Sequence, residues 1–142
     1  MSPTAGRTAA RLARVVEKAL DEVELSMSQY RVLSLLSESS AAAKVLASQL
    51  VVSKPSVTAL VDGLVARGLV ERRPDPEDRR RVVHELTDEG AKLVTRADEA
   101  TATRLANLCG LLSPSKQDRA GNGLALWDEA IDRFREARVA AS

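Results

Sequence analysis

This chain of 142 residues has little cysteine, histidine or aromatic content. Its single cysteine excludes a disulfide bond within the chain. Tryptophan, tyrosine and phenylalanine occur once each, so a hydrophobic core has to be built from leucine, valine and alanine. The formal net charge is only +1, which means that charge has to be interpreted locally rather than for the whole molecule.

Long apolar runs are also absent from the sequence. The start of the chain has no hydrophobic stretch typical of a secretory signal, and no later segment is long enough to span a bilayer. We therefore expect a cytoplasmic protein without membrane contact. No cluster of metal-ligand side chains surrounds His84 in the sequence, so we expect neither a metal nor a cofactor.

Helical periodicity is what the sequence has in abundance. Apolar residues recur at spacings of three and four over residues 12–23, which predicts an amphipathic helix. Ser26 followed by Gln29 predicts a capping box at the start of a second helix. A short third helix is expected over residues 41–50. Its expected buried positions are Val45, Leu46 and Leu50.

A fourth helix is followed directly by a hairpin. Ser53 is a good N-cap for this helix, Pro55 is tolerated in its first turn, and Gly68 ends it. Two short strand-forming runs follow at residues 69–73 and 81–86, with a turn rich in proline and aspartate between them. The pattern predicts a two-stranded wing after the helix.

A long helix is predicted after the hairpin. Thr87 is expected to cap it, and it should run to about Leu112. Cys109 lies among leucines there, so we interpret it as core filler rather than a redox sensor. The expected buried positions of this helix are Leu93, Ala97, Ala100, Leu105 and Leu108.

The last helix is predicted to begin at Ser113 and Pro114, with residues 121–123 kinking or loosening it. Its apolar positions are Leu124, Trp127, Ile131 and Phe134. Together with the first helix and the long helix before it, it carries more apolar surface than the small central unit can cover. We therefore expect a second copy of the chain to pack there; a self-contained helical bundle is the alternative.

The central unit has the order of a winged helix-turn-helix, in which the second helix fits the major groove of DNA. Small polar residues at the start of that helix can reach phosphates or base edges. These residues are Ser53, Lys54, Pro55, Ser56 and Thr58. Because any capped helix start looks similar, a merely solvated helix end is the alternative interpretation.

Arginine is concentrated in the hairpin, at Arg72, Arg73, Arg79, Arg80 and Arg81. Guanidinium groups bind phosphates and enter narrow minor grooves, and Asp78 is close enough in sequence to hold the side chain of Arg80 extended. Acidic residues in the turn neutralise part of this charge, so a solvated loop of ion pairs is the alternative. The preceding helix favours contact with DNA.

These residues resemble the MarR family of bacterial winged helix-turn-helix regulators over nearly the whole chain. The match is closest in the segment SKPSVTALVD at residues 53–62. It continues in LVARGLVER at 64–72, DRRR at 78–81 and LTDEG at 86–90.

The resemblance implies a mainly α fold with a small β-hairpin wing. Residues 1–142 would form one domain, with a winged helix-turn-helix at 26–87 and dimerisation helices within 1–25 and 88–142. It implies an obligate homodimer that inserts residues 54–67 into the major groove and the wing into the flanking minor groove. The site would be palindromic, with half-sites roughly 34 Å apart.

On this basis the function is a sequence-specific transcriptional regulator, most often a repressor, and not an enzyme. A winged-helix module that binds protein instead of DNA is the alternative. The expected DNA-binding residues are Ser53, Lys54, Pro55, Ser56, Thr58, Ala59, Arg73, Asp78, Arg79, Arg80 and Arg81. Ala59 and Gly63 depart from the family pattern, because many members carry larger polar or basic side chains there.

The resemblance also implies a small phenolic or lipophilic effector. Many family members release DNA when such a molecule binds between the dimerisation helices and the winged unit. Tyr30 and Arg31 are the residues expected near that pocket.

Overall fold

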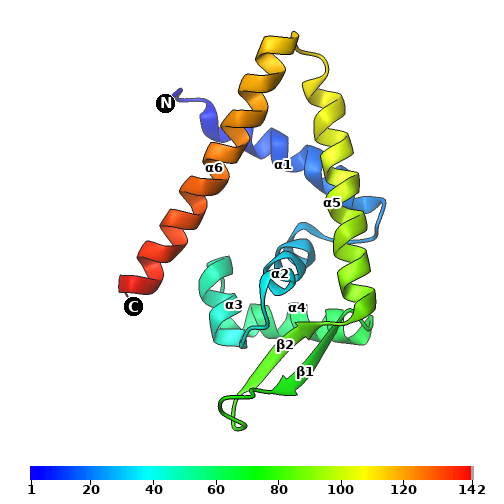
Figure 1. Cartoon of the computed structure of the whole chain (residues 1–142), viewed down its shortest axis with the longest axis vertical. Coiled ribbons are helices and arrows are strands. Elements are labelled where there is room, and N and C mark those ends of the chain that lie inside the picture. Colours follow the sequence, from blue (N-terminus) through cyan, green and yellow to red (C-terminus); the bar gives the residue numbers. More distant parts are fainter. Residues whose placement is uncertain (142) are drawn as a thin grey trace. The chain divides into compact units, whose positions relative to one another are not determined.

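The computed structural model describes residues 1–141, and Figure 1 shows its helices and its two-stranded wing. The elements are α1 Ala5–Asp21, α2 Met27–Glu38, α3 Ala43–Leu50, α4 Lys54–Ala66, β1 Val70–Pro74, β2 Val82–Leu86, α5 Asp88–Cys109 and α6 Pro114–Ala141. The predicted mainly α fold with a hairpin wing is confirmed. Contacts divide the chain into two compact units, Met1–Arg104 and the segment from Leu105 onward. The predicted single domain, with a winged helix-turn-helix at residues 26–87 between dimerisation helices, stays a prediction.

Local side-chain hydrogen bonds start α2 and α4 where the sequence predicts. Ser26 Oγ accepts from the Gln29 backbone N–H at 3.1 Å, and Gln29 Oε1 accepts from the Ser26 backbone N–H at 3.0 Å. Ser53 Oγ accepts from the Ser56 N–H at 3.3 Å, with Pro55 in the first turn of α4. These bonds satisfy backbone donors that a helix start otherwise leaves unpaired.

A left-handed glycine separates α4 from the wing. Gly68 has φ +72°, and the Leu69 N–H turns back to the Leu64 carbonyl at 3.0 Å. Glycine adopts this conformation without steric cost, which explains why the helix ends here. The strands then pair antiparallel from Val70 opposite Leu86 to Pro74 opposite Val82.

A short bridge joins the α2–α3 connection to the wing. Ala41 and His84 exchange backbone hydrogen bonds of 3.1 and 2.8 Å, and His84 Nδ1 lies 2.9 Å from the Ala41 carbonyl oxygen. His84 is thereby buried with a partner. No local pattern in the sequence predicts this bridge, because its partners are far apart along the chain.

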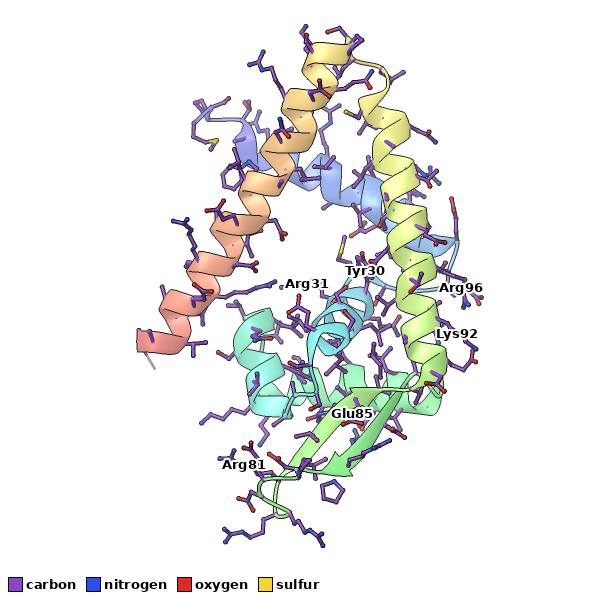
Figure 2. All side chains as sticks on the ribbon, in the orientation of Figure 1. Tyr30, Arg31, Arg81, Glu85, Lys92 and Arg96 are labelled. Carbon is purple, nitrogen blue, oxygen red and sulfur yellow. The ribbon has the colours of Figure 1, made fainter. Side chains whose placement is uncertain are left out.

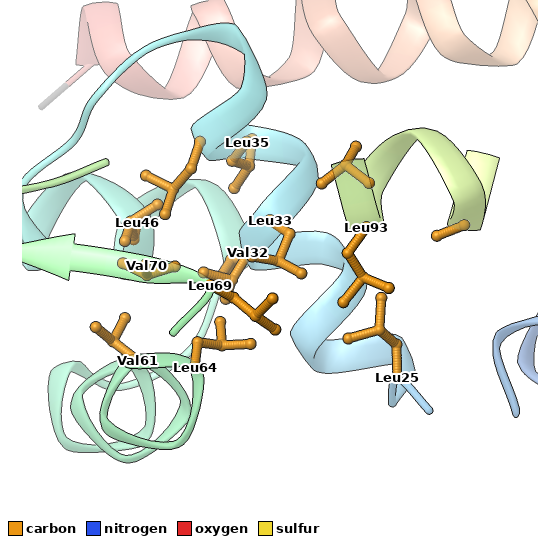
Figure 3. Packing of buried hydrophobic residues seen from close by; sticks show 14 of the residues in the cluster. Leu25, Val32, Leu33, Leu35, Leu46, Val61, Leu64, Leu69, Val70 and Leu93 are labelled. Atoms are coloured by element: carbon orange, nitrogen blue, oxygen red, sulfur yellow. The ribbon is translucent and has the colours of Figure 1, made fainter. Parts of the chain in front are cut away.

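The core of the first unit lies between α2, α3, α4, the wing and α5, as Figure 3 shows. Leu33 of α2, Leu46 of α3 and Leu64 of α4 have no exposed surface. Val70 of β1 and Leu93 of α5 pack against them. Burying one leucine contributes about 2 kcal/mol, so this cluster holds α4 firmly against the core. Because the buried residues lie on one side of α4, its other side remains exposed.

Several expected core positions are wrong. Val45 is 46% exposed, whereas Leu46 and Leu50 of the same short helix are buried as expected. In α5 the buried positions end at Thr101, so Ala100 and Leu105 are only partly buried and Leu108 is exposed. The upper part of α5 therefore finds no core partner within the described chain.

The second unit exposes most of its apolar side chains. None of the described residues of α6 is buried, and Leu124, Trp127, Ile131 and Phe134 are all exposed. The helix runs through residues 121–123 as one element, so the expected interruption does not occur.

Cys109 closes the turn between α5 and α6. It is partly buried, and its Sγ lies 3.8 Å from the Gln117 carbonyl oxygen. The packed leucine face expected around it is not formed, since Leu108, Leu111 and Leu112 are exposed. Within residues 1–141, no helix combines the length and apolar character needed to cross a membrane.

Candidate nucleic-acid interface

The exposed side of α4 holds the polar residues expected to meet DNA. Val57, Val61 and Leu64 anchor the helix in the core. The residues that face outward at its start are Ser53, Lys54, Pro55, Ser56, Thr58 and Ala59. The structure therefore brings the helical part of the expected site together on one accessible surface.

The hydroxyl groups at the start of α4 are partly engaged within the helix. Ser53 Oγ and Ser56 Oγ share a hydrogen bond of 2.8 Å. Thr58 Oγ1 donates to the Lys54 carbonyl at 3.1 Å, so it offers a partner mainly lone pairs. Lys54 supplies the positive charge of this surface.

The tip of the wing is closed by Asp78. Its Oδ1 accepts from the Arg80 backbone N–H at 3.1 Å and from Arg80 Nε at 3.3 Å, while Asp78 Oδ2 lies 4.0 Å from Arg81 Nε. The Arg80 side chain remains 91% exposed. The predicted pairing of Asp78 with Arg80 is confirmed as a contact. Among the described residues, Arg79 has no ion pair, and Figure 2 shows Arg81 at the same end of the hairpin.

Arg73 lies apart from the tip residues and is paired within the hairpin. Its Nη2 lies 2.5 Å from Glu71 Oε1, and its Nε lies 3.2 Å from Glu85 Oε2. The hydrogen bond and charge of Glu71, together with the charge of Glu85, raise the pKa of the Arg73 guanidinium. Any contact of Arg73 with a phosphate must therefore compete with two carboxylates.

The ion pair of Asp62 is a feature of this surface that sequence reasoning missed. Asp62 is exposed on α4, and its carboxylate forms an ion pair with Arg72 Nη2 of β1. A carboxylate on a DNA-facing helix repels phosphate unless a cation neutralises it. No spacing rule connects the two residues, because they belong to different elements, so the sequence held no signal for the pair.

The two residues expected at an effector pocket turn toward different elements, as Figure 2 shows. The Tyr30 hydroxyl donates to Asp98 Oδ1 of α5 at 2.5 Å, whereas Arg31 Nη2 donates to the Leu50 carbonyl at the end of α3 at 3.3 Å. Burial raises the pKa of Tyr30 above 10.0, and the hydrogen bond to Asp98 raises it further.

A hollow of about 550 Å³ lies between α2, β2 and α5. Its lining residues are Leu36, Ser37, Ser40, Glu85, Leu86, Ala91, Val94, Thr95 and Asp98. Asp98 is therefore shared between the hollow and the hydrogen bond with Tyr30. Neither Tyr30 nor Arg31 is itself part of this lining.

Helix α4 is held in the core by one side, its start is polar and exposed, and the wing that follows it carries arginines at its tip. This arrangement defines a winged helix-turn-helix protein of the DNA-binding class. The model of the MarR family matches residues 24–81. The HTH-type transcriptional regulator ML2140 of Mycobacterium leprae is 32% identical over 86% of this chain and 86% of its own. The chain belongs to the MarR family of transcriptional regulators.

Solved structures agree with this assignment. The transcriptional repressor CouR bound to a 23-mer DNA duplex is 30% identical, with a TM-score of 0.72 over 87% of this chain and 88% of that one. CouR from Rhodococcus jostii RHA1 bound to p-coumaroyl-CoA is 26% identical, with a TM-score of 0.69 over 84% and 85%. The chain is therefore similar to proteins that have been captured both on DNA and with a small ligand.

Proposed function

We propose that this DNA-binding regulator acts in the cytoplasm as a homodimeric repressor on a palindromic operator and carries out no catalysis. The observation that carries the proposal is the pairing of an exposed polar start of α4 with an arginine that Asp78 holds at the wing tip. Both features belong to the first compact unit and lie at the same end of it (Figure 1). Two points of contact at one end suit adjacent grooves of a duplex.

In this proposal α4 lies in the major groove. Lys54 binds a phosphate or a guanine, and Ser56 and Thr58 bind a phosphate or a base edge. Pro55 and Ala59 supply close apolar contact. Arg79, Arg80 and Arg81 bind the phosphates of the flanking minor groove, and Asp78 orients Arg80. Arg73 contributes only after it leaves Glu71 and Glu85.

The dimer is proposed from the apolar surface that the chain leaves uncovered. Trp127 is 56% exposed and Phe134 is 60% exposed, on a helix with no buried described residue. Exposed apolar side chains in this number on one helix favour burial against a partner. A second copy gives two recognition helices related by a two-fold axis, which a palindrome matches.

An effector is proposed by likeness to CouR, which has been solved bound to p-coumaroyl-CoA. A small phenolic or lipophilic molecule enters the hollow at Asp98, and Tyr30 responds because its hydroxyl shares that carboxylate. Arg31 carries the change to α3, because its guanidinium donates a hydrogen bond to the Leu50 carbonyl at the end of that helix. Such a molecule releases DNA only if it binds the dimer that is incompetent for DNA more tightly than the competent one.

A salt titration of DNA binding tests the proposal. The logarithm of affinity should fall steeply with the logarithm of salt concentration, and Arg80→Ala should lower that slope by about 0.9 for the phosphate contact it loses. Arg133→Ala on α6 removes the same charge from an exposed position and should leave the slope unchanged. A flat salt response would instead support a protein-binding module, and unchanged binding in Arg80→Ala would remove the wing from the mechanism.

A further inference from the structure

The end of the recognition helix is tied directly to the start of α5. Thr87 Oγ1 donates to the Gly68 carbonyl at 2.6 Å, and the Thr87 backbone N–H donates to the Leu69 carbonyl at 3.1 Å. The same Oγ1 accepts from the Gly90 N–H at 3.0 Å. One threonine therefore caps α5 and holds the turn that follows α4.

Gly90 brings the two backbones into direct contact. A Cβ atom at Gly90 would lie 2.0 Å from the Leu69 carbonyl oxygen, a distance at which one backbone has to move. The Leu69 N–H is bonded to the Leu64 carbonyl in the last turn of α4. A shift of α5 at Gly90 is therefore passed through Leu69 to α4.

The geometry of α5 makes this junction a lever. Its 22 residues extend for about 33 Å from the junction. A tilt of about 6° at one end of such a rod displaces the other by about 3.4 Å, which is close to the rise of one base pair. A small change of angle between α4 and α5 therefore equals one step along a DNA duplex.

We infer that Thr87 and Gly90 are positioning residues that fix the angle between α4 and α5 and so set the half-site spacing that the dimer accepts. The inference rests on the proposed dimer on a palindrome. Neither residue contacts DNA in this role. They act through α4, whose outward side chains bind the bases and phosphates.

Two substitutions separate positioning from helix capping. Thr87→Asp keeps an acceptor for the Gly90 N–H, and so keeps the cap, but it has no donor for the Gly68 carbonyl. Thr87→Ser keeps both. Thr103→Val is the control, because Thr103 is exposed on the same helix and does not line the hollow between α2, β2 and α5.

The measurement is the affinity of each full-length variant for operator duplexes whose half-site spacing differs by one base pair in either direction. The wild type should prefer one spacing at least about tenfold, which corresponds to ~1.4 kcal/mol. Thr87→Asp should reduce that preference at least threefold, or move it to a neighbouring spacing. Thr87→Ser and Thr103→Val should keep the wild-type preference. Circular dichroism checks that each variant is folded, and Thr87→Val is the second variant lacking the donor.

The outcomes separate this inference from the proposed function. A wild type that prefers one spacing, with Thr87→Asp and Thr87→Val preferring it equally, leaves the dimer intact and overturns the positioning role. An equal loss of affinity for every spacing in Thr87→Asp also overturns it, since that result indicates a general structural role. A wild type that sediments as a monomer overturns the proposed dimer, and this inference with it.

Discussion

The winged unit and helix α6 both carry large apolar side chains, but only the winged unit buries them. Leu33, Leu46 and Leu64 have no exposed surface, whereas Trp127 and Ile131 are 56% and 47% exposed. Burial removes apolar surface from water and is the main favourable term in folding. The same kinds of residue therefore stabilise the fold in one region and, in our proposal, the dimer in the other.

The two regions also pair their charges differently. Some ion pairs of the first unit join separate elements. These are Asp62–Arg72 between α4 and β1, Arg73–Glu85 between the strands, and Arg104–Glu22 between α5 and the segment after α1. Others are local, such as Arg14–Glu17 and Lys92–Glu89. Those of α6 join neighbours about one turn apart, as in Arg133–Glu129 and Arg135–Asp132. Exposed pairs contribute only about 0–1 kcal/mol each. The main effect of the pairs that join separate elements is to orient one element against another.

The largest expected effect tests which leucines hold the fold. Leu64→Ala should lower the free energy of unfolding by about 2–5 kcal/mol, because it opens a cavity under α4. The matched control is Leu111→Ala, at a position 83% exposed in the second unit, which should change stability by less than about 0.5 kcal/mol. Urea unfolding at one fixed protein concentration measures both. Equal losses would abolish the contrast between the regions.

The next effect concerns what the apolar side of α6 does. Ile131→Glu places a charge among Leu124, Trp127 and Phe134 and should weaken self-association at least about tenfold. Asn122→Glu puts the same charge on the opposite side of the helix and should leave association unchanged. Sedimentation over a dilution series compares the two variants. A dimer that survives Ile131→Glu at every dilution would contradict the proposed interface.

Local patterns in the sequence predict the elements on both sides of this comparison. The capping box of Ser26 and Gln29, the cap at Ser53 and the stop at Gly68 each depend on residues within a few positions of one another. The exposed α6 face follows from the same periodicity. The wing tip was also predictable to the level of one contact, between Asp78 and Arg80, because only one residue lies between them.

Contacts between elements were beyond such patterns. Asp62 meets Arg72 only after α4 and β1 have packed, and Gly90 meets Leu69 only because α5 returns to the end of α4. The failure at Val45 has a related cause, since a helix of eight residues carries too few apolar positions to fix its inward side by periodicity.

A double substitution sharpens the comparison of charges. Arg72→Gln leaves Asp62 unpaired on the exposed side of α4 and should lower DNA affinity by about threefold to tenfold at low salt. Asp62→Asn should restore affinity in that background. Asp132→Asn, which breaks a pair within α6, should change nothing. If Arg72→Gln binds DNA as well as the wild type, the pair does not screen the recognition helix.

The smallest effect is a titration at the edge of the core. Tyr30 is the only tyrosine, so phenolate absorbance reports it alone. Its pKa is raised in the folded protein, first by burial and then by Asp98, so its midpoint should lie above 10.0 and return toward 10.0 in urea. Its stabilising contribution is complete below pH 10 and is lost as the pH rises through the folded-state pKa.

Asp98→Asn separates the two causes. Removing the carboxylate should lower the Tyr30 midpoint, because both the hydrogen bond and the charge of Asp98 raise the pKa of Tyr30. A titration midpoint at or below 10.0 for Tyr30 in the folded wild type would contradict its burial at the edge of the core.

The bridge between Ala41 and His84 has a consequence for how the protein behaves when crowded. A lone hairpin presents two open edges, and open edges invite strand pairing between molecules and aggregation. The two backbone bonds to Ala41 occupy the outer edge of β2 at its centre. Ala41, which lies outside the hairpin, therefore protects the protein at high concentration against edge-to-edge association through β2.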